Sequence, residues 1–153
     1  FRRVLFRSPK MMKQVADHVN IPLASGERIY WRWGYRPFLE DGSLSVIQPD
    51  ICTCGGISEV KKICDMAHVY DVTVQIHVCG GPISTAAALH MEAAIPNFMI
   101  HELHRYALLE PNTRTCIHNY MPSKGRYTVP ELPGLGQELT PETIAASDII
   151  TVK

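Results

Sequence analysis

Hydrophobic and polar positions follow two different rhythms along this chain. Apolar residues recur at helical spacing in four stretches, which predict helices over 9–19, 30–41, 57–70 and 83–94. Short apolar runs lie between these stretches and predict strands over 23–26, 44–47, 72–76 and 98–100. Strands that alternate with helices at intervals of roughly 25 residues are typical of parallel βα units, so the pattern predicts an α/β fold. Periodicity alone leaves open whether the four units form half of a barrel or a small open sheet.

The character of the sequence changes after residue 102. Residues 103–153 are irregular and rich in proline, and one short helix is expected over 141–147. We expect this tail to pack on another part of the protein. Residues 1–8 are basic and apolar, fit nothing downstream and are interpreted as a non-native or sequence-assembly scar. Residues 9–102 therefore hold all of the predicted βα units.

The composition is that of an ordinary globular domain. The chain has 153 residues, of which 46% are hydrophobic and 20% are charged. Fifteen basic residues balance fifteen acidic ones, so the net charge gives no reason to expect binding to nucleic acid or to an acidic membrane surface. Because the sequence has no apolar run of about eighteen residues, no transmembrane helix is expected. The composition predicts a soluble domain with neither nucleic acid nor a membrane as partner.

The cysteines and aromatic residues suggest no special site. Five cysteines at irregular spacing argue against a disulfide framework and favour a reducing cytoplasm. Cys52 and Cys54 form a C-x-C pair, which fits structural zinc spacing poorly, so free thiols are the favoured state. Trp31, Trp33 and Tyr35 are interpreted as side chains that pack a helix rather than as a cofactor site.

Each predicted strand is followed by a titratable residue. These residues are Glu27, Asp50, His77 and Glu102. Taken singly, each has an ordinary explanation as a solvated carboxylate, a turn residue, a structural histidine or half of a surface ion pair. In a (β/α)₈ barrel, however, the carboxyl ends of all strands face one site. Four chemically useful side chains at four successive strand ends therefore favour a barrel.

The motifs around these residues resemble those of the enolase superfamily, in its mandelate racemase group. The matching segments are Gly26-Glu27, Gln48-Pro49-Asp50 with Gly55-Gly56-Ile57, His77 in VQIHVCGGP, and Glu102 in IHELH. The four titratable residues lie 23, 27 and 25 positions apart, as in galactonate-dehydratase-like acid-sugar dehydratases. The resemblance covers residues 9–153. It implies the C-terminal half of a (β/α)₈ barrel, about four βα units, followed by an irregular tail that packs on a capping domain.

The resemblance also implies a role for each of the four residues. Glu27 is expected to bind Mg²⁺, and His77 to act as the general base that removes the proton next to the substrate carboxylate. Asp50 is expected to hydrogen-bond the far ring nitrogen of His77 and fix its tautomer. Glu102, kept protonated, is expected to donate a hydrogen bond to the developing oxyanion. Loss of the β-hydroxyl would give a 2-keto-3-deoxy acid, so the full-length parent is predicted to be a Mg²⁺-dependent lyase of aldonates or aldarates.

Three alternatives remain open at this point. The superfamily also contains racemases, epimerases and cycloisomerases, which share the first proton abstraction. The capping domain and the first four barrel strands, with the other Mg²⁺ ligands, are absent from the sequence, so the chain alone is predicted to be inactive. It could instead be a non-catalytic fragment or pseudoenzyme. A nucleotide-binding open sheet is disfavoured, because no Gly-rich phosphate motif follows a strand. The full-length form is expected to be a cytoplasmic homo-oligomer.

Overall fold

The computed structural model describes residues 8–151, and they form an alternating α/β arrangement. Its first part consists of α2 (Pro9–Ala16), β1 (Ala24–Ser25), α3 (Trp31–Glu40), β2 (Val46–Ile47), α4 (Ile57–Val69), β3 (Thr73–Val74) and α5 (Pro82–Ala93). Its second part has the short helices η1 (Arg105–Leu108), α6 (Glu110–Thr113) and α7 (Pro141–Ala145). The predicted alternation of strands and helices is confirmed.

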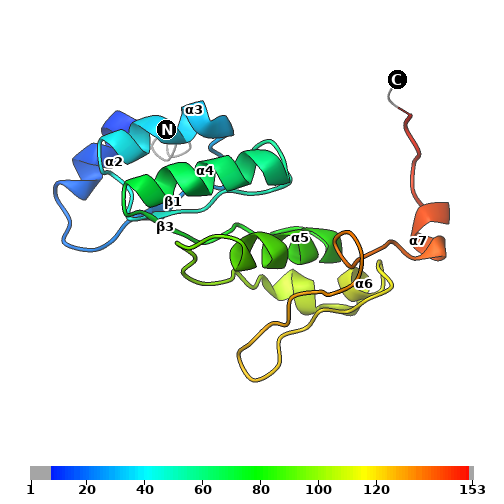
Figure 1. Cartoon of the computed structure of the whole chain (residues 1–153). Helices are drawn as coiled ribbons and strands as arrows, with labels where there is room; N and C mark the ends of the chain where they lie inside the picture. Colours follow the sequence, from blue (N-terminus) through cyan, green and yellow to red (C-terminus); the bar gives the residue numbers. More distant parts are fainter. Residues whose placement is uncertain (1–7, 152–153) are drawn as a thin grey trace.

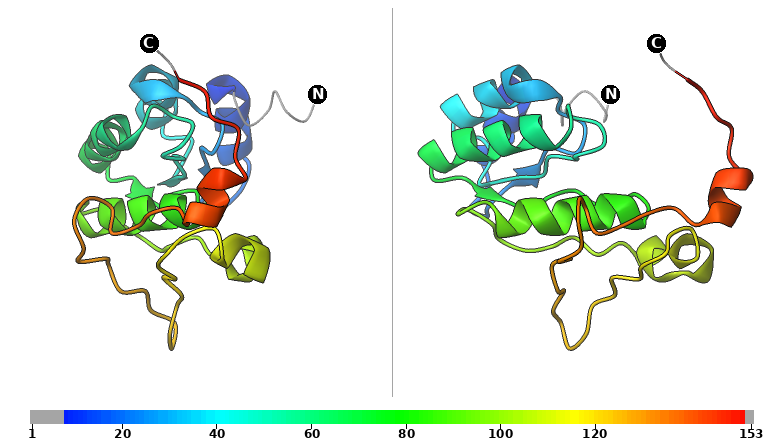
Figure 2. Two further views of the ribbon diagram at one scale, coloured as in Figure 1. Left: turned by 90° about the vertical axis from the view of Figure 1, so that its right-hand side faces the viewer. Right: turned by 45° about the vertical axis from the view of Figure 1, so that its right-hand side comes forward.

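The strands form a parallel sheet in the order β1-β2-β3. Val46 is in register with Ala24 on one side and with Thr73 on the other. Each helix contacts the next one along the chain, from α2 through α3 and α4 to α5. Seen end-on, these helices form an arc around the strands (Figure 2, left). One layer of helices thus covers one face of a short, curved sheet.

The prediction of a fourth strand over 98–100 is wrong, because this segment does not form a strand. Phe98 forms only an isolated parallel bridge with Val74. The Val74 N–H donates to the Asn97 carbonyl at 2.8 Å, and the Met99 N–H donates to the Val74 carbonyl at 2.9 Å. The segment therefore occupies the position of a fourth strand beside β3. Beyond this bridge, no further ladder joins the segment to β3 among residues 8–151.

Apolar side chains from the strands and the helix arc form one core. The largest fully buried side chains are Tyr35, Phe38, Ile47, Val60, Ile63, Ile76 and Val74. Cys54 and Cys64 join this core, and burial raises the pKa of both thiols to about 12, so they pack as neutral groups. All five cysteines are free thiols.

The aromatic residues near the start of α3 divide between core and solvent. Tyr35 is buried as expected, and its hydroxyl donates to the Gly26 carbonyl at 2.7 Å, which satisfies its polar end. Trp33 is 68% exposed and Trp31 is 52% exposed, so the expectation of helix packing is wrong for Trp33. The guanidinium of Arg32 lies 5.0 Å from the centre of the Trp33 ring, which is a surface cation–π contact.

Local signals explain the ends of the helices. The Ser8 hydroxyl accepts from the Met11 N–H at 3.4 Å, and a proline follows at the first position of α2. This helix ends at Ala16 rather than at residue 19, and α7 ends at Ala145 rather than at residue 147. Helices α3, α4 and α5 agree with their predicted ranges to within one residue at each end, whereas η1 and α6 were not predicted.

The C-terminal segment runs along α5 and then away from it, and α7 lies apart from the helix arc (Figure 1). His90 on α5 contacts the Leu135 carbonyl through Nε2 at 3.3 Å. The segment is held internally by an antiparallel bridge between Cys116 and Leu139. That it packs on a capping domain stays a prediction. Of the proposed scar, residues 1–7 lie outside the described residues. Within residues 8–151, no helix is long and apolar enough to cross a membrane.

Gly26 provides a test of how tightly the strand ends pack. Its φ is +150°, and an added Cβ would lie 2.6 Å from the backbone nitrogen of Gln48. Gly42 also has positive φ, +64°, but its Cβ position meets only open space. We expect Gly26→Ala to lower the free energy of unfolding by about 3 kcal/mol and Gly42→Ala by about 1 kcal/mol. Urea denaturation measures both, and equal losses would contradict the close approach of β1 and β2.

Candidate active site

The four predicted site residues lie at one edge of the sheet. Glu27 follows β1, Asp50 follows β2, His77 follows β3, and Glu102 follows the segment that bridges to β3. Asp50 and His77 are themselves paired as an isolated parallel bridge, with the His77 N–H donating to the Pro49 carbonyl at 3.0 Å. Parallel pairing brings the carboxyl ends of neighbouring strands together, so these side chains gather at one place.

The imidazole of His77 lies between two carboxylates. Its Nδ1 is 2.7 Å from Oδ2 of Asp50, and its Nε2 is 3.0 Å from Oε2 of Glu27. The Glu27 side chain is 50% exposed and that of Asp50 is 11% exposed, so the partner at Nε2 faces solvent more than the partner at Nδ1 does. With Nδ1 donating to Asp50, Nε2 faces an acceptor oxygen of Glu27, and that contact is a hydrogen bond only when Nε2 carries a proton. A general base needs a lone pair on Nε2, so His77 could act as one only when Glu27 has turned to another partner, such as a cation.

Asp50 is held rigidly by the turn that follows it. Its Oδ1 accepts from the backbone N–H groups of Cys52 at 2.8 Å and Thr53 at 3.0 Å. The second oxygen is thereby directed to His77. This is the turn role expected of an aspartate after proline, and it serves at the same time to orient the histidine. The catalytic role of both residues remains a prediction.

Glu102 is anchored beside His77 through the backbone. Its Oε2 accepts from the Val78 N–H at 2.8 Å. The preceding residue, His101, points instead toward α5, where its Nδ1 is 2.8 Å from Oε2 of Glu92. Burial raises the pKa of Glu92, and the hydrogen bond with His101 opposes that shift. Neighbouring residues in an extended chain face opposite ways, so Glu102 belongs to the site and His101 to the helix layer.

Glu27 fits Mg²⁺ as one ligand among several. Its carboxylate is half-exposed, and Oε1 lies 3.2 Å from Nε of Arg28. A hard, accessible oxygen is the donor that Mg²⁺ prefers, but an octahedral site needs more than one such group. Within the part of the chain that the structure describes, no group of three or more His, Cys, Asp or Glu side chains could hold a metal ion.

One contact near the site escaped the sequence pattern. Glu59, on α4, accepts at Oε1 from both the backbone N–H and Nε of Arg32, at 3.0 and 2.9 Å. Glu59 is buried, whereas an acid in the first turn of a helix is ordinarily a solvated residue. The pattern gave no signal for this pair, because the two residues are 27 positions apart and only the fold brings them together.

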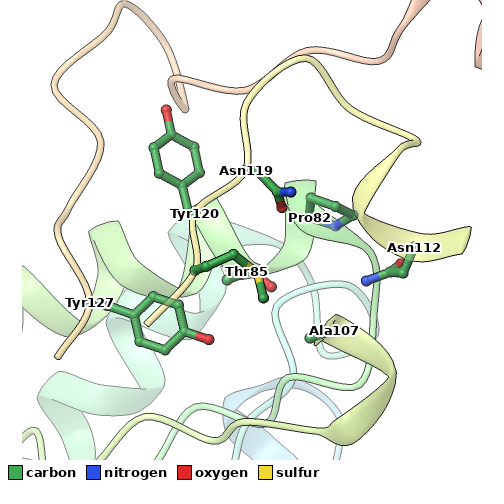
Figure 3. Close-up of a pocket in the computed structure, with 8 residues that line it drawn as sticks. Pro82, Thr85, Ala107, Asn112, Asn119, Tyr120 and Tyr127 are labelled. Carbon is green, nitrogen blue, oxygen red and sulfur yellow. The ribbon is translucent and has the colours of Figure 1, made fainter. Parts of the chain in front are cut away.

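Two hollows lie away from this cluster. The smaller one, between α5 and the C-terminal segment (Figure 3), is lined by Pro82, Thr85, Ala107, Asn112, Asn119, Tyr120, Met121 and Tyr127. Its volume of about 10 Å³ is roughly that of one water molecule. The larger one, about 580 Å³, is an open apolar hollow beside Phe98, Met99, Ile100 and Leu103. Neither is lined by any of the four strand-end residues.

Comparison with known proteins identifies the family. Residues 5–143 match the family described as Enolase C-terminal domain-like. The chain belongs to this family. The prediction of a C-terminal, partial enolase-type barrel is thereby confirmed. Members of the enolase superfamily generally use Mg²⁺.

Two curated relatives are sugar-acid dehydratases. The chain is 33% identical over 143 residues to D-galactonate dehydratase of Ralstonia pickettii (strain 12J), covering 89% of this chain and 37% of that protein. It is 34% identical over 142 residues to D-xylonate dehydratase of Haloferax volcanii, covering 89% and 33%. The chain thus spans about a third of the length of the curated relatives it matches.

Solved structures agree with this assignment. A member of the enolase superfamily from Salmonella Typhimurium superposes with a TM-score of 0.93 at 82% identity, covering 95% of this chain and 37% of that one. An enolase from Agrobacterium radiobacter, solved with Na and L-malate bound, superposes with a TM-score of 0.83 at 30% identity, covering 95% and 40%. The enolase-family fold of this chain is therefore shared by proteins of widely different identity to it.

The Glu59–Arg32 contact predicts a pH dependence of stability. The backbone N–H of Arg32 holds the pKa of Glu59 below its usual value of 4.5. A lowered pKa means that the stabilisation is fully present above that value and is lost as the pH falls through the folded-state pKa. We expect Glu59→Gln to be less stable than the wild type at neutral pH, with a difference that shrinks below about pH 4.5. Urea denaturation across this range measures the difference, and a pH-independent gap would contradict it.

Proposed function

We propose that the full-length protein containing this chain dehydrates a sugar acid, an aldonate or aldarate, to a 2-keto-3-deoxy acid. The observation that carries the proposal is the His77 imidazole, oriented by Asp50 at Nδ1 and in contact at Nε2 with Glu27, the proposed metal ligand. This arrangement suits removal of a weakly acidic proton next to a carboxylate. The two curated relatives, a galactonate and a xylonate dehydratase, support the same reaction class.

The chain's own residues divide the work of this reaction. Asp50 fixes the ring of His77 by hydrogen bonding at Nδ1, so that Nε2 receives the proton. Glu102 accepts the Val78 N–H at one oxygen and keeps the other for a hydrogen bond. A protonated Glu102 would donate that bond to the oxygen on which negative charge develops. A base and an acid on neighbouring strand ends are what an enolate-forming reaction needs.

Glu27 would supply one ligand to Mg²⁺ in the full-length protein. When bound, the metal stabilises the negative charge of the enolate formed from the substrate carboxylate. The remaining ligands would come from sequence outside this chain, and the chain alone is proposed to be inactive. The L-malate bound to the Agrobacterium radiobacter relative is itself a 2-hydroxy acid, which is compatible with an acid substrate. The cytoplasmic location and the homo-oligomeric state stay predictions.

A paired assay tests this proposal. This chain and the full-length protein would be incubated with Mg²⁺ and a panel of aldonic and aldaric acids, and 2-keto-3-deoxy acid would be measured. We expect activity only in the full-length protein. Replacing His77 with Asn should lower kcat by about 10²–10⁴-fold. The matched control is His68→Asn, at an exposed histidine in the last turn of α4.

Other outcomes of the assay would contradict the proposal. If the full-length protein exchanges the α-hydrogen of an acid with D₂O but releases no keto acid, the racemase or cycloisomerase reaction replaces it. Neither exchange nor keto acid with any substrate would leave a non-catalytic role. Equal losses in His77→Asn and His68→Asn would show that His77 is not the base.

A further inference from the structure

The chain turns sharply between Glu27 and helix α3. Trp31, the first residue of this helix, has a φ of 59°. This is the left-handed region, which a bulky side chain seldom adopts because its Cβ crowds the backbone. Such a conformation persists only where surrounding contacts hold it, and it often marks a functional site. The contacts that hold Trp31 therefore indicate what this corner does.

Two of these contacts come from the turn that follows Asp50. The Trp31 N–H donates to the Cys54 carbonyl at 3.3 Å. The Trp31 ring packs over Gly55, so closely that a Cβ on this glycine would lie 2.8 Å from a ring carbon. The same Cβ would lie 2.9 Å from Cγ of Glu59. Gly55 is thus enclosed between Trp31 and Glu59. This packing joins the loop before α3 to the turn that follows Asp50.

The third contact is a helix cap supplied from another helix. Helix α3 has no side-chain cap of its own. Glu59, from α4, takes this role by accepting at Oε1 from the Arg32 N–H in the first turn of α3, and from Arg32 Nε. A carboxylate is favoured at a helix N-terminus, where N–H groups lack partners within the helix. Glu59 is only 7% exposed, whereas the Arg32 side chain is 40% exposed, so the contact of Oε1 with the Arg32 backbone N–H is the better shielded of the two.

We propose that Glu59 is a positioning residue for the site. By capping α3 from α4, it holds the loop that carries Glu27 against the turn that carries Asp50. Glu27 lies four residues before Trp31, and Asp50 lies four residues before Cys54. The two carboxylates that enclose His77 therefore stand on loops joined by this cap. The inference rests on the proposed function, because it takes Glu27 as a metal ligand and Asp50 as the partner of the base.

The first arm of the test asks whether Glu59 holds Trp31. In a Trp33→Phe background, Trp31 is the only tryptophan of the chain, and acrylamide quenching of its fluorescence reports its exposure. Because 52% of Trp31 is already exposed, we expect Glu59→Ala to raise the quenching constant by about twofold. The control, Glu40→Ala, removes an exposed partner of Arg36 on the same helix and should leave quenching unchanged. Unchanged quenching in Glu59→Ala would overturn the inference.

The second arm asks whether this cap reaches the metal ligand. Mn²⁺, a paramagnetic probe that takes the same hard oxygen ligands as Mg²⁺, would be titrated into the full-length protein and followed by EPR. Loss of a residue that orients a ligand typically weakens metal binding by about 10–100-fold, and we expect Glu59→Ala to weaken it by at least about tenfold. Glu59→Gln, which keeps an acceptor oxygen, should recover part of this affinity. Glu40→Ala should bind as the wild type does.

The outcomes separate this inference from the proposed function. If the wild type binds Mn²⁺ and Glu59→Ala binds it equally well, the cap is only structural and the inference is wrong, while the proposed function stands. If the wild type neither binds Mn²⁺ nor releases a keto acid, the proposed function is wrong, and the positioning role that rests on it is wrong as well. Thermal melts followed by circular dichroism establish that each variant is folded. If Glu59→Ala does not fold, the Mn²⁺ affinity of Glu59→Gln decides: a smaller loss than tenfold supports the inference, and wild-type affinity contradicts it.

Discussion

The contact of His77 with Asp50 and Glu27 depends on the register of three parallel strand ends. Asp50 and His77 are bridge partners, so both side chains emerge on the same face of the sheet. A slip of one residue would turn one of them to the opposite face. Register therefore decides whether the base and its partner meet at all. The bridge also places Val78 where its N–H can anchor Glu102.

Contacts outside the sheet hold this register in place. The strands are only two residues long, and so few ladder hydrogen bonds fix their ends weakly. Gly26 lets β1 approach the backbone of β2, and the buried Tyr35 hydroxyl ties helix α3 to the same glycine. Glu59 adds a link between the two following loops. The helix layer thus fixes the register of the strand ends, which in a longer sheet would be fixed by ladder hydrogen bonds.

The edge beyond β3 has a different character. The segment at Phe98 is joined to β3 by a single bridge, and a large apolar hollow opens beside it. The chain spans about a third of the curated relatives, which belong to a family of much longer proteins. As proposed, Glu27 would provide one oxygen ligand, where a hard divalent ion needs several. The chemistry is therefore proposed for the full-length protein and not for this chain alone.

The sequence by itself determined the order of the elements and the residues at the strand ends. Helices α4 and α5 were predicted to within one residue, because the spacing of apolar side chains on one helix face is a local property. The family resemblance followed from four short motifs and was confirmed. The roles of Glu27, Asp50, His77 and Glu102 stay predictions, although the structure places all four at one edge.

The tertiary structure decided what depends on partners distant in the chain. The segment at Phe98 forms one bridge with β3 rather than a strand, which a run of apolar residues does not reveal. Trp33 faces solvent, although this aromatic side chain was expected to pack against its helix. The cap that Glu59 places on α3 joins residues 27 positions apart. Periodicity records which face of a segment is apolar, whereas contact across the fold depends on where other segments lie.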